Sequence, residues 1–279
     1  MAIGSLNTLV TLNLSHTGIE DLPRNFLKGL HEVRILDISK NSMEFIPAEI
    51  QYHGTDINEL ILDGNPIQKL KSHSFSSMKN LQKLSLQKMP FLHEIKASAF
   101  SGLVALKTLK IVENPRLAYI DPDAFMDFQH PMILENVDFS NNYLRYMPKD
   151  LLFGLGKNSS LQSFRVEGNV WECDCHNQWL IDLMNTLEFR RFGIEAECSK
   201  PSNLQGKYFR FLRKKVSRNQ SKKKLAIFPR IFPDFFQNFS EFFFFEFLSG
   251  FLIFFREFLD VKNLISLKKL EYPSLETFQ

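Results

Sequence analysis

Cysteine is scarce in this chain, with three residues among 279. All three lie between residues 173 and 198, and an odd number leaves at least one thiol without a disulfide partner in the same chain. Long apolar runs are also missing. The most apolar stretch, Phe242–Phe255, has 14 residues and contains Glu246 and Ser249, whereas a bilayer-spanning helix needs about 20 apolar residues. The sequence therefore predicts no membrane-spanning helix.

Catalytic motifs are absent as well. The seven histidines are scattered along the sequence, and there is no H-E-x-x-H pair, nucleophile elbow or phosphate-binding glycine loop. We expect no enzymatic activity, no cofactor, no metal ion and no small-molecule substrate.

Charge and phenylalanine divide the chain into two parts. Up to Lys207 there are 21 Lys and Arg against 24 Asp and Glu, a net charge of −3; from Tyr208 onward the counts are 13 and 7, a net charge of +6. Of the 29 phenylalanines, 17 lie in this second part. Because the first part is net acidic, it does not favour binding to nucleic acid phosphates.

The first part repeats a template, L-x-x-L-x-L-x-x-N-x-L, seven times. The copies begin at Leu9, Val33, Ile57, Leu81, Leu106, Leu134 and Leu161, at steps of 24, 24, 24, 25, 28 and 27 residues. Template and period resemble those of the leucine-rich repeat family.

This resemblance implies an α/β fold, a leucine-rich repeat solenoid. It would have a curved parallel sheet on the concave side, an irregular or short helical convex side, a small helical C-terminal cap and a poorly ordered Phe-rich tail. We expect about seven repeats over residues 1–168, an incomplete cap over 169–207 and an unstructured or misassigned tail over 208–279.

The asparagine of the template marks the turn after each strand. A buried amide there can satisfy backbone groups that an apolar residue would leave unpaired. Thr17 and Met89 replace it in two repeats, so we expect those turns to be looser or differently bonded.

Function in such solenoids is expected on the outward side chains of the concave sheet. The predicted binding residues form a basic middle and acidic flanks: Lys83, Lys88, Lys107 and Lys110, with Glu59, Asp63 and Asp138. This sign pattern suits a protein ligand with complementary charges.

The stretch N-V-W-E-C-D-C-H, followed by Trp179 and Cys198, resembles the C-terminal flanking cap of extracellular leucine-rich repeat proteins. The resemblance implies a Cys173–Cys198 disulfide and leaves Cys175 unpaired, because the fourth cysteine of the family pattern is missing. A zinc site of Cys173, Cys175, His176 and Cys198 is the alternative; the two-residue cysteine separation disfavours it.

The apolar residues after the cysteines recur at helical spacing. We expect a helix from about His176 to Glu188 that covers the last coil with Trp179, Leu183, Met184 and Leu187.

Both ends of the sequence depart from the family pattern. Met1 falls inside a repeat, so we expect the natural protein to extend upstream with a signal peptide and an N-terminal cap. The family pattern stops at Lys207, and we interpret the tail as a retained intron or misassigned exon. Disorder and a basic membrane-binding arm are the other interpretations.

The resemblance implies a non-catalytic protein-binding module of an extracellular or cell-surface protein of the adhesion, receptor or matrix type. Its location would be extracellular or at the plasma membrane, through an anchor outside this sequence. The sequons at Asn13 and Asn158 agree with glycosylation there. The alternative is an intracellular leucine-rich repeat scaffold.

Overall fold

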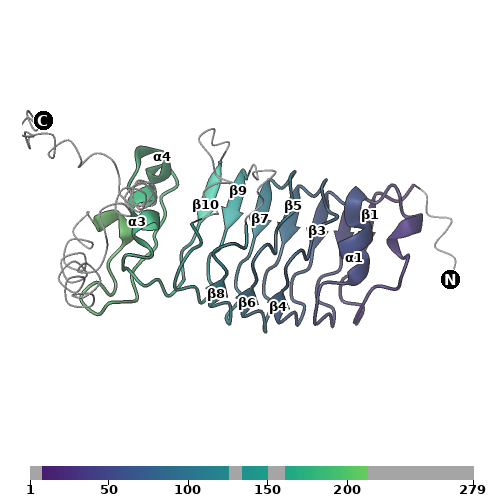
Figure 1. The fold of residues 1–279 in the computed structure, drawn as a ribbon, viewed down its shortest axis with the longest axis horizontal. Helices are drawn as coiled ribbons and strands as arrows, with labels where there is room; N and C mark the ends of the chain where they lie inside the picture. The colour runs from purple at the N-terminus through teal and green to yellow at the C-terminus, as the bar shows by residue number, and fades with distance from the viewer. Residues whose placement is uncertain (1–7, 126–133, 150–160, 213–279) are drawn as a thin grey trace, which may run out of the picture. The chain divides into compact units, whose positions relative to one another are not determined.

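The computed structural model describes residues 8–125, 134–149 and 161–212 (Figure 1). All described residues belong to one compact unit. The prediction for Asn158, most of the predicted tail and the start of the chain at Met1 fall outside the described residues.

A seven-stranded parallel sheet runs along the repeats, with one strand from each. The strands are β1 (Thr11–Asn13), β2 (Ile35–Asp37), β3 (Glu59–Ile61), β5 (Lys83–Ser85), β7 (Thr108–Lys110), β9 (Asn136–Asp138) and β10 (Ser163–Arg165). Their order in the sheet follows the order in the sequence. The predicted leucine-rich repeat solenoid is confirmed.

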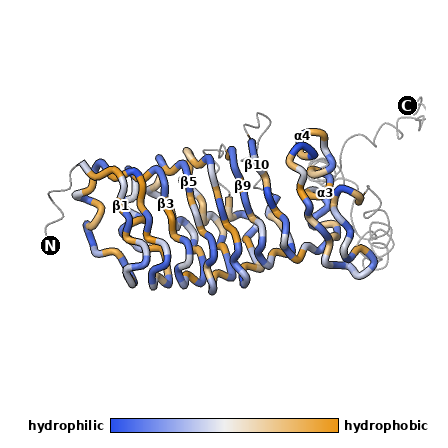
Figure 2. Tube along the Cα trace, turned by 180° about the vertical axis from the view of Figure 1, so that it is seen from behind, coloured by the Kyte–Doolittle hydropathy of each residue, from blue (hydrophilic) through white to orange (hydrophobic). Residues whose placement is uncertain are grey.

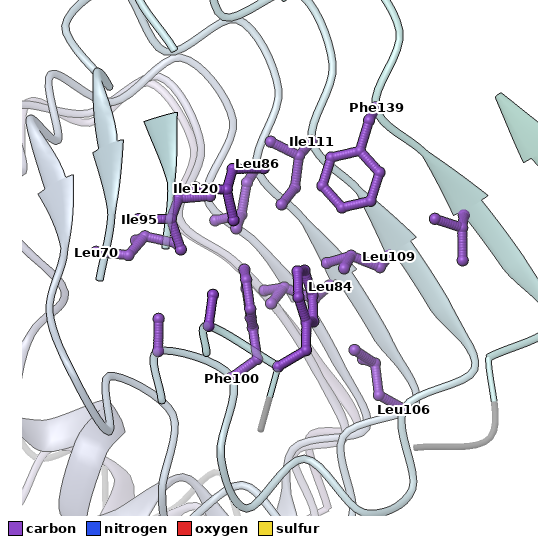
Figure 3. Close-up of a cluster of buried hydrophobic side chains, with 14 of the residues drawn as sticks. Leu70, Leu84, Leu86, Ile95, Phe100, Leu106, Leu109, Ile111, Ile120 and Phe139 are labelled. Atoms are coloured by element: carbon purple, nitrogen blue, oxygen red, sulfur yellow. The ribbon is translucent and has the colours of Figure 1, made fainter. Parts of the chain in front are cut away.

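The period of two in the template determines which side chains enter the core. The middle residues of β2 to β10, from Leu36 to Phe164, pair in register and are buried, while their neighbours in each strand are partly or fully exposed. Figure 2 shows hydrophobic and hydrophilic residues alternating along the coils. In Figure 3, Leu84, Leu109 and Phe100 project into this common core.

The template asparagines form a buried ladder between neighbouring coils. Asn142 is an example: its Oδ1 accepts the backbone N–H of Asn114 at 2.9 Å, and its Nδ2 donates to the carbonyls of Ile111 and Phe139 at 2.7 and 2.8 Å. The members that bond backbone groups in this way are Asn41, Asn65, Asn114, Asn142 and Asn169. The predicted role of the template amide is confirmed.

The two exceptional turns are differently bonded, as predicted. The hydroxyl of Thr17 donates to the carbonyl of Leu14 at 2.7 Å, and its N–H donates to Asn41 Oδ1. The Met89 side chain is fully buried, and its N–H donates to Asn114 Oδ1 at 2.8 Å. A methionine side chain has no amide to bond the preceding coil. The asparagine ladder therefore lacks one member, between Asn65 and Asn114.

The opposite side of the coils carries short elements. A second parallel sheet consists of β4 (Lys69–Leu70), β6 (Glu94–Ile95) and β8 (Tyr119–Ile120). The helices of the described repeats are α1 (Ala48–His53) and the 3₁₀ helices η2 (Leu27–Gly29) and η3 (Gly54–Asp56). An irregular or short helical side was predicted; the three-stranded sheet was not.

The cap contains two short helices where one was predicted. They are α3 (Gln178–Met184) and α4 (Leu187–Arg190), and both follow β10 at the C-terminal end of the stack (Figure 1). The prediction that Leu187 covers the core is wrong, because it is 85% exposed. The turn after α3 changes the helix direction, and Thr186 starts α4 by accepting the Phe189 N–H.

Ordered packing in the cap extends past Lys207. The 3₁₀ helix η4 (Phe209–Phe211) places the Phe209 ring 6.4 Å from that of Trp171, and Phe209 is 1% exposed. The boundary predicted at residue 207 therefore falls inside a packed segment that reaches Leu212. Within the described ranges, the structure has no helix whose length and apolar character would let it cross a membrane.

Candidate binding face

The outward face of the main sheet contains a hollow of about 620 Å³. Its walls are side chains of β3, β5, β7, β9 and β10 and of the residues that follow these strands. We call the outward side chains of the seven strands and of the residues that follow them the concave face. Parallel in-register pairing brings residues about 24 to 28 positions apart into neighbouring rows of this face.

Five of the seven predicted binding residues line this hollow: Glu59, Asp63, Lys83, Lys110 and Asp138. The other two do not. Lys107 precedes β7 and forms an ion pair with Glu135 at 3.0 Å, and Lys88 follows β5 and lies 3.8 Å from Glu113. These two lysines are therefore separated from the hollow and are ion-paired within the protein.

The β3–β5 side of the hollow is bonded across coils. Lys83 Nζ lies 3.1 Å from Glu59 Oε2. Asp63 Oδ1 accepts the Ser85 hydroxyl and the Gln87 backbone N–H, each at 2.8 Å, and its Oδ2 accepts the Gln87 amide at 3.2 Å. The acidic residues on this side are thus already engaged by the neighbouring repeat.

The β9–β10 side of the hollow centres on Asp138. Its Oδ1 accepts both the N–H and the hydroxyl of Ser140, and its Oδ2 lies 3.9 Å from Arg165 Nε. Arg165 also lies 3.8 Å from Glu167. Arg165 was not predicted as a binding residue, because the predicted cations were those of the middle repeats.

Lys110 differs from every other charged residue of the hollow. Across residues 8–125, 134–149 and 161–212 its side chain makes no hydrogen bond or ion pair, and that side chain is exposed on β7. The other charged residues are Glu59, Asp63, Lys83, Asp138 and Arg165, so the hollow has three carboxylates and three cations. The positive and negative charges of the hollow are therefore equal in number. Of the four lysines predicted as its basic middle, Lys110 is the one whose side chain has no ion-pair partner in the described residues.

The lining contains no histidine or cysteine, so a Ser–His or Cys–His catalytic pair does not occur in this hollow. Asn13, the predicted glycosylation site within the described residues, is exposed on β1. Its Oδ1 accepts the Ser15 N–H, and its Nδ2 donates to Asp37 at 3.3 Å.

The cap has the disulfide that the family resemblance implied. Cys173 and Cys198 are bonded with their Cα atoms 5.6 Å apart, and both are buried. Cys175 is free and exposed. The alternative zinc site is excluded in its four-ligand form, because two of its thiols are bonded to each other.

Comparison with known proteins agrees with this architecture. A family model described as leucine rich repeat matches residues 55–115. The chain is 26% identical over 161 residues to Tsukushi of Gallus gallus, and the match covers 58% of this chain and 41% of that protein. A second match, to Tsukushi of Xenopus tropicalis, is 30% identical over 86 residues, covering 31% and 24% of the two chains.

A receptor is also similar. The chain is 28% identical over 170 residues to leucine-rich repeat-containing G-protein coupled receptor 5 of Rattus norvegicus, covering 59% of this chain and 15% of the receptor. The chain thus spans less than half the length of the relatives it matches. The repeated template, the parallel sheet with its asparagine ladder and these matches show a leucine-rich repeat solenoid, here closed by a cap with one disulfide.

Proposed function

We propose that this chain is a non-catalytic protein-binding module of an extracellular or cell-surface protein, and that its ligand binds on the concave face. The observation that carries the proposal is the hollow over β3 to β10, in which one cation, Lys110, has no partner within the described structure. A partner carboxylate can therefore bind Lys110 without first breaking an internal ion pair.

Two further features support a protein ligand. The equal numbers of carboxylates and cations in the hollow suit complementary charges on another protein. Phosphate binding would need an excess of cations, which this surface lacks. Lys88 and Lys107, which were also predicted to bind the ligand, lie outside the hollow and would contact only a ligand that extends beyond it.

The cap supports an extracellular location over an intracellular scaffold. Disulfides form and persist in oxidising compartments, and Cys173–Cys198 is buried in the cap core. The similarity to a receptor points the same way. An exposed Asn13 could carry the predicted glycan, which would restrict ligand access at the β1 end of the concave face.

Charge reversal tests where the ligand binds. The tagged chain is screened against purified secreted proteins and ectodomains, and the affinity of each hit is measured for Lys110→Glu and Lys83→Glu. We expect Lys110→Glu to weaken binding at least about tenfold and to reduce its salt dependence.

Lys79→Glu is the matched control, because Lys79 is an exposed lysine outside the hollow. Equal weakening by Lys79→Glu and Lys110→Glu would move the ligand away from the concave face. Hits confined to cytosolic proteins, in a parallel panel, would favour the intracellular scaffold.

A further inference from the structure

A compact group of metal-binding side chains lies on the cap, outside the concave face. Asp174, Cys175 and His176 each offer one ligand atom, and all three atoms lie within 4.8 Å of one another. Cys175 and His176 are exposed and Asp174 is half-buried. Because the disulfide occupies the other two cysteines, this group contains the free thiol of the chain.

His176 Nδ1 lies close to both of the other ligand atoms. Cys175 Sγ lies 3.9 Å from His176 Nδ1, and Asp174 Oδ2 lies 3.2 Å from the same nitrogen. In a tetrahedral zinc site with Zn–S of about 2.3 Å and Zn–N and Zn–O of about 2.1 Å, the S–N and N–O separations are about 3.5 and 3.4 Å. These two separations in the cap differ from the tetrahedral values by a few tenths of an ångström, and the third, between Cys175 Sγ and the Asp174 oxygen, is within 4.8 Å.

The same geometry argues against a catalytic role for the thiol. A Cys–His–Asp catalytic arrangement uses one imidazole nitrogen toward the nucleophile and the other toward the carboxylate. Here both the thiol and the carboxylate approach Nδ1. A proton relay through the ring is therefore not formed, whereas three donors around one position suit chelation.

The carboxylate is held in place by Tyr146 of the sixth repeat. The Tyr146 hydroxyl donates to Asp174 Oδ2 at 3.2 Å and to Glu172 Oε2 at 2.7 Å, and the Tyr146 ring packs edge-on against His176 at 5.4 Å. Such outer contacts orient ligand side chains in metal sites.

We propose that Asp174, Cys175 and His176 form a surface site for a borderline-soft divalent cation of the zinc type. The Cys175 thiolate, His176 Nδ1 and an Asp174 oxygen bind the ion, and the thiol proton is released to solvent on binding. The fourth position faces solvent and is filled by water or by a donor from a second molecule. Thiolate, imidazole and carboxylate together favour zinc over magnesium or calcium, which prefer oxygen ligands.

The test uses the full chain, folded oxidatively with Cys175 kept reduced, and Co²⁺ or Zn²⁺ alone as the probe. We expect one Co²⁺ per chain, a sulfur-to-cobalt charge-transfer band in the near ultraviolet, and loss of that band when Zn²⁺ is added. Cys175→Ser should abolish the band, and His176→Gln should weaken Zn²⁺ binding at least about tenfold.

His53→Gln provides the control, because His53 is exposed at the end of α1, far along the sequence from the cap. Unchanged Trp fluorescence shows that each variant keeps its folded cap. Zinc uptake that survives both Cys175→Ser and His176→Gln would overturn the proposal. So would a Cys175–Cys175 disulfide dimer that forms equally with and without zinc.

Discussion

The repeats and the cap are stabilised by different kinds of contact. In the repeats, one asparagine per coil bonds the backbone of the coil before it, and the bond pattern recurs from Asn41 to Asn169. In the cap, Asn177 makes the last such bonds, to Arg145 and Glu172, and a single disulfide and aromatic contacts then take over. Stability in the repeats should therefore be shared between neighbours, and in the cap it should depend on few contacts.

The two regions can be followed separately. Both tryptophans of the chain, Trp171 and Trp179, lie in the cap, so fluorescence reports cap unfolding, whereas far-ultraviolet circular dichroism is dominated by the repeats. The four changes below are ordered from the largest expected effect to the smallest, each measured by urea unfolding with both signals.

Asn142→Ala should have the largest effect. It leaves the Asn114 N–H and the Ile111 carbonyl unpaired in a buried turn, and it removes one of two bonds to the Phe139 carbonyl, which keeps the bond from Asn169 Nδ2. At about 1–3 kcal/mol for each unpaired group, we expect a loss of about 5 kcal/mol. The exposed Asn80, with one bond to Thr55, is the control, and Asn80→Ala should cost under about 1 kcal/mol. A small effect of Asn142→Ala would contradict the ladder.

Phe209→Ala tests whether the segment after Lys207 belongs to the cap. Removing a buried phenylalanine ring costs about 3–5 kcal/mol, and we expect about 4 kcal/mol in the fluorescence transition. Phe211 is two residues away and 68% exposed, so Phe211→Ala should change little. Equal effects of the two variants would mean that the cap ends before Phe209.

Removal of the disulfide should affect the cap more than the repeats. The double variant Cys173→Ala/Cys198→Ala opens a loop with a sequence separation of 25, for which we expect a loss of about 3 kcal/mol. The fluorescence transition should shift to lower urea while the circular dichroism transition shifts less. Coincident shifts of both signals would show that cap and repeats unfold as one unit.

Tyr146→Phe should have the smallest effect. It removes the hydroxyl that joins the sixth repeat to Glu172 and Asp174 of the cap and leaves the ring in place. We expect a loss of about 1 kcal/mol, typical of one hydrogen bond. Tyr52→Phe is the control, since Tyr52 is 71% exposed. A loss as large as that from the missing disulfide would make this contact a main support of the cap.

The sequence predicted what repeats. Period-two alternation fixed the strand register, and the template asparagine fixed the bonded turns, because both recur seven times or nearly so. Contacts that occur once in the structure could not be predicted from the repeat pattern. Glu49 on α1 is 5% exposed and accepts the N–H groups of Asn25 and Leu27, yet no pattern distinguishes it from a solvent-exposed glutamate.

The candidate site shows the same division. Strand alternation predicted that Lys83, Lys110 and Asp138 point outward, and all three line the hollow. A lysine forms an ion pair only where its side chain reaches a carboxylate on the neighbouring coil, as Lys107 reaches Glu135. The period of the repeat does not predict the distance between such side chains. The break between α3 and α4 and the packing of Phe209 likewise depend on contacts made once.

The missing rung at Met89 makes one junction of the stack unlike the others. No asparagine side chain bonds the coil of β5 to that of β3 inside the turn. The two coils are instead joined by side chains on the concave face. Asp63 bonds Ser85 and Gln87, and Glu59 pairs with Lys83. A ligand that binds these side chains would compete with the hydrogen bonds and the ion pair that join the two coils. If a ligand binds the hollow in this way, we expect its binding to loosen the solenoid at this one junction.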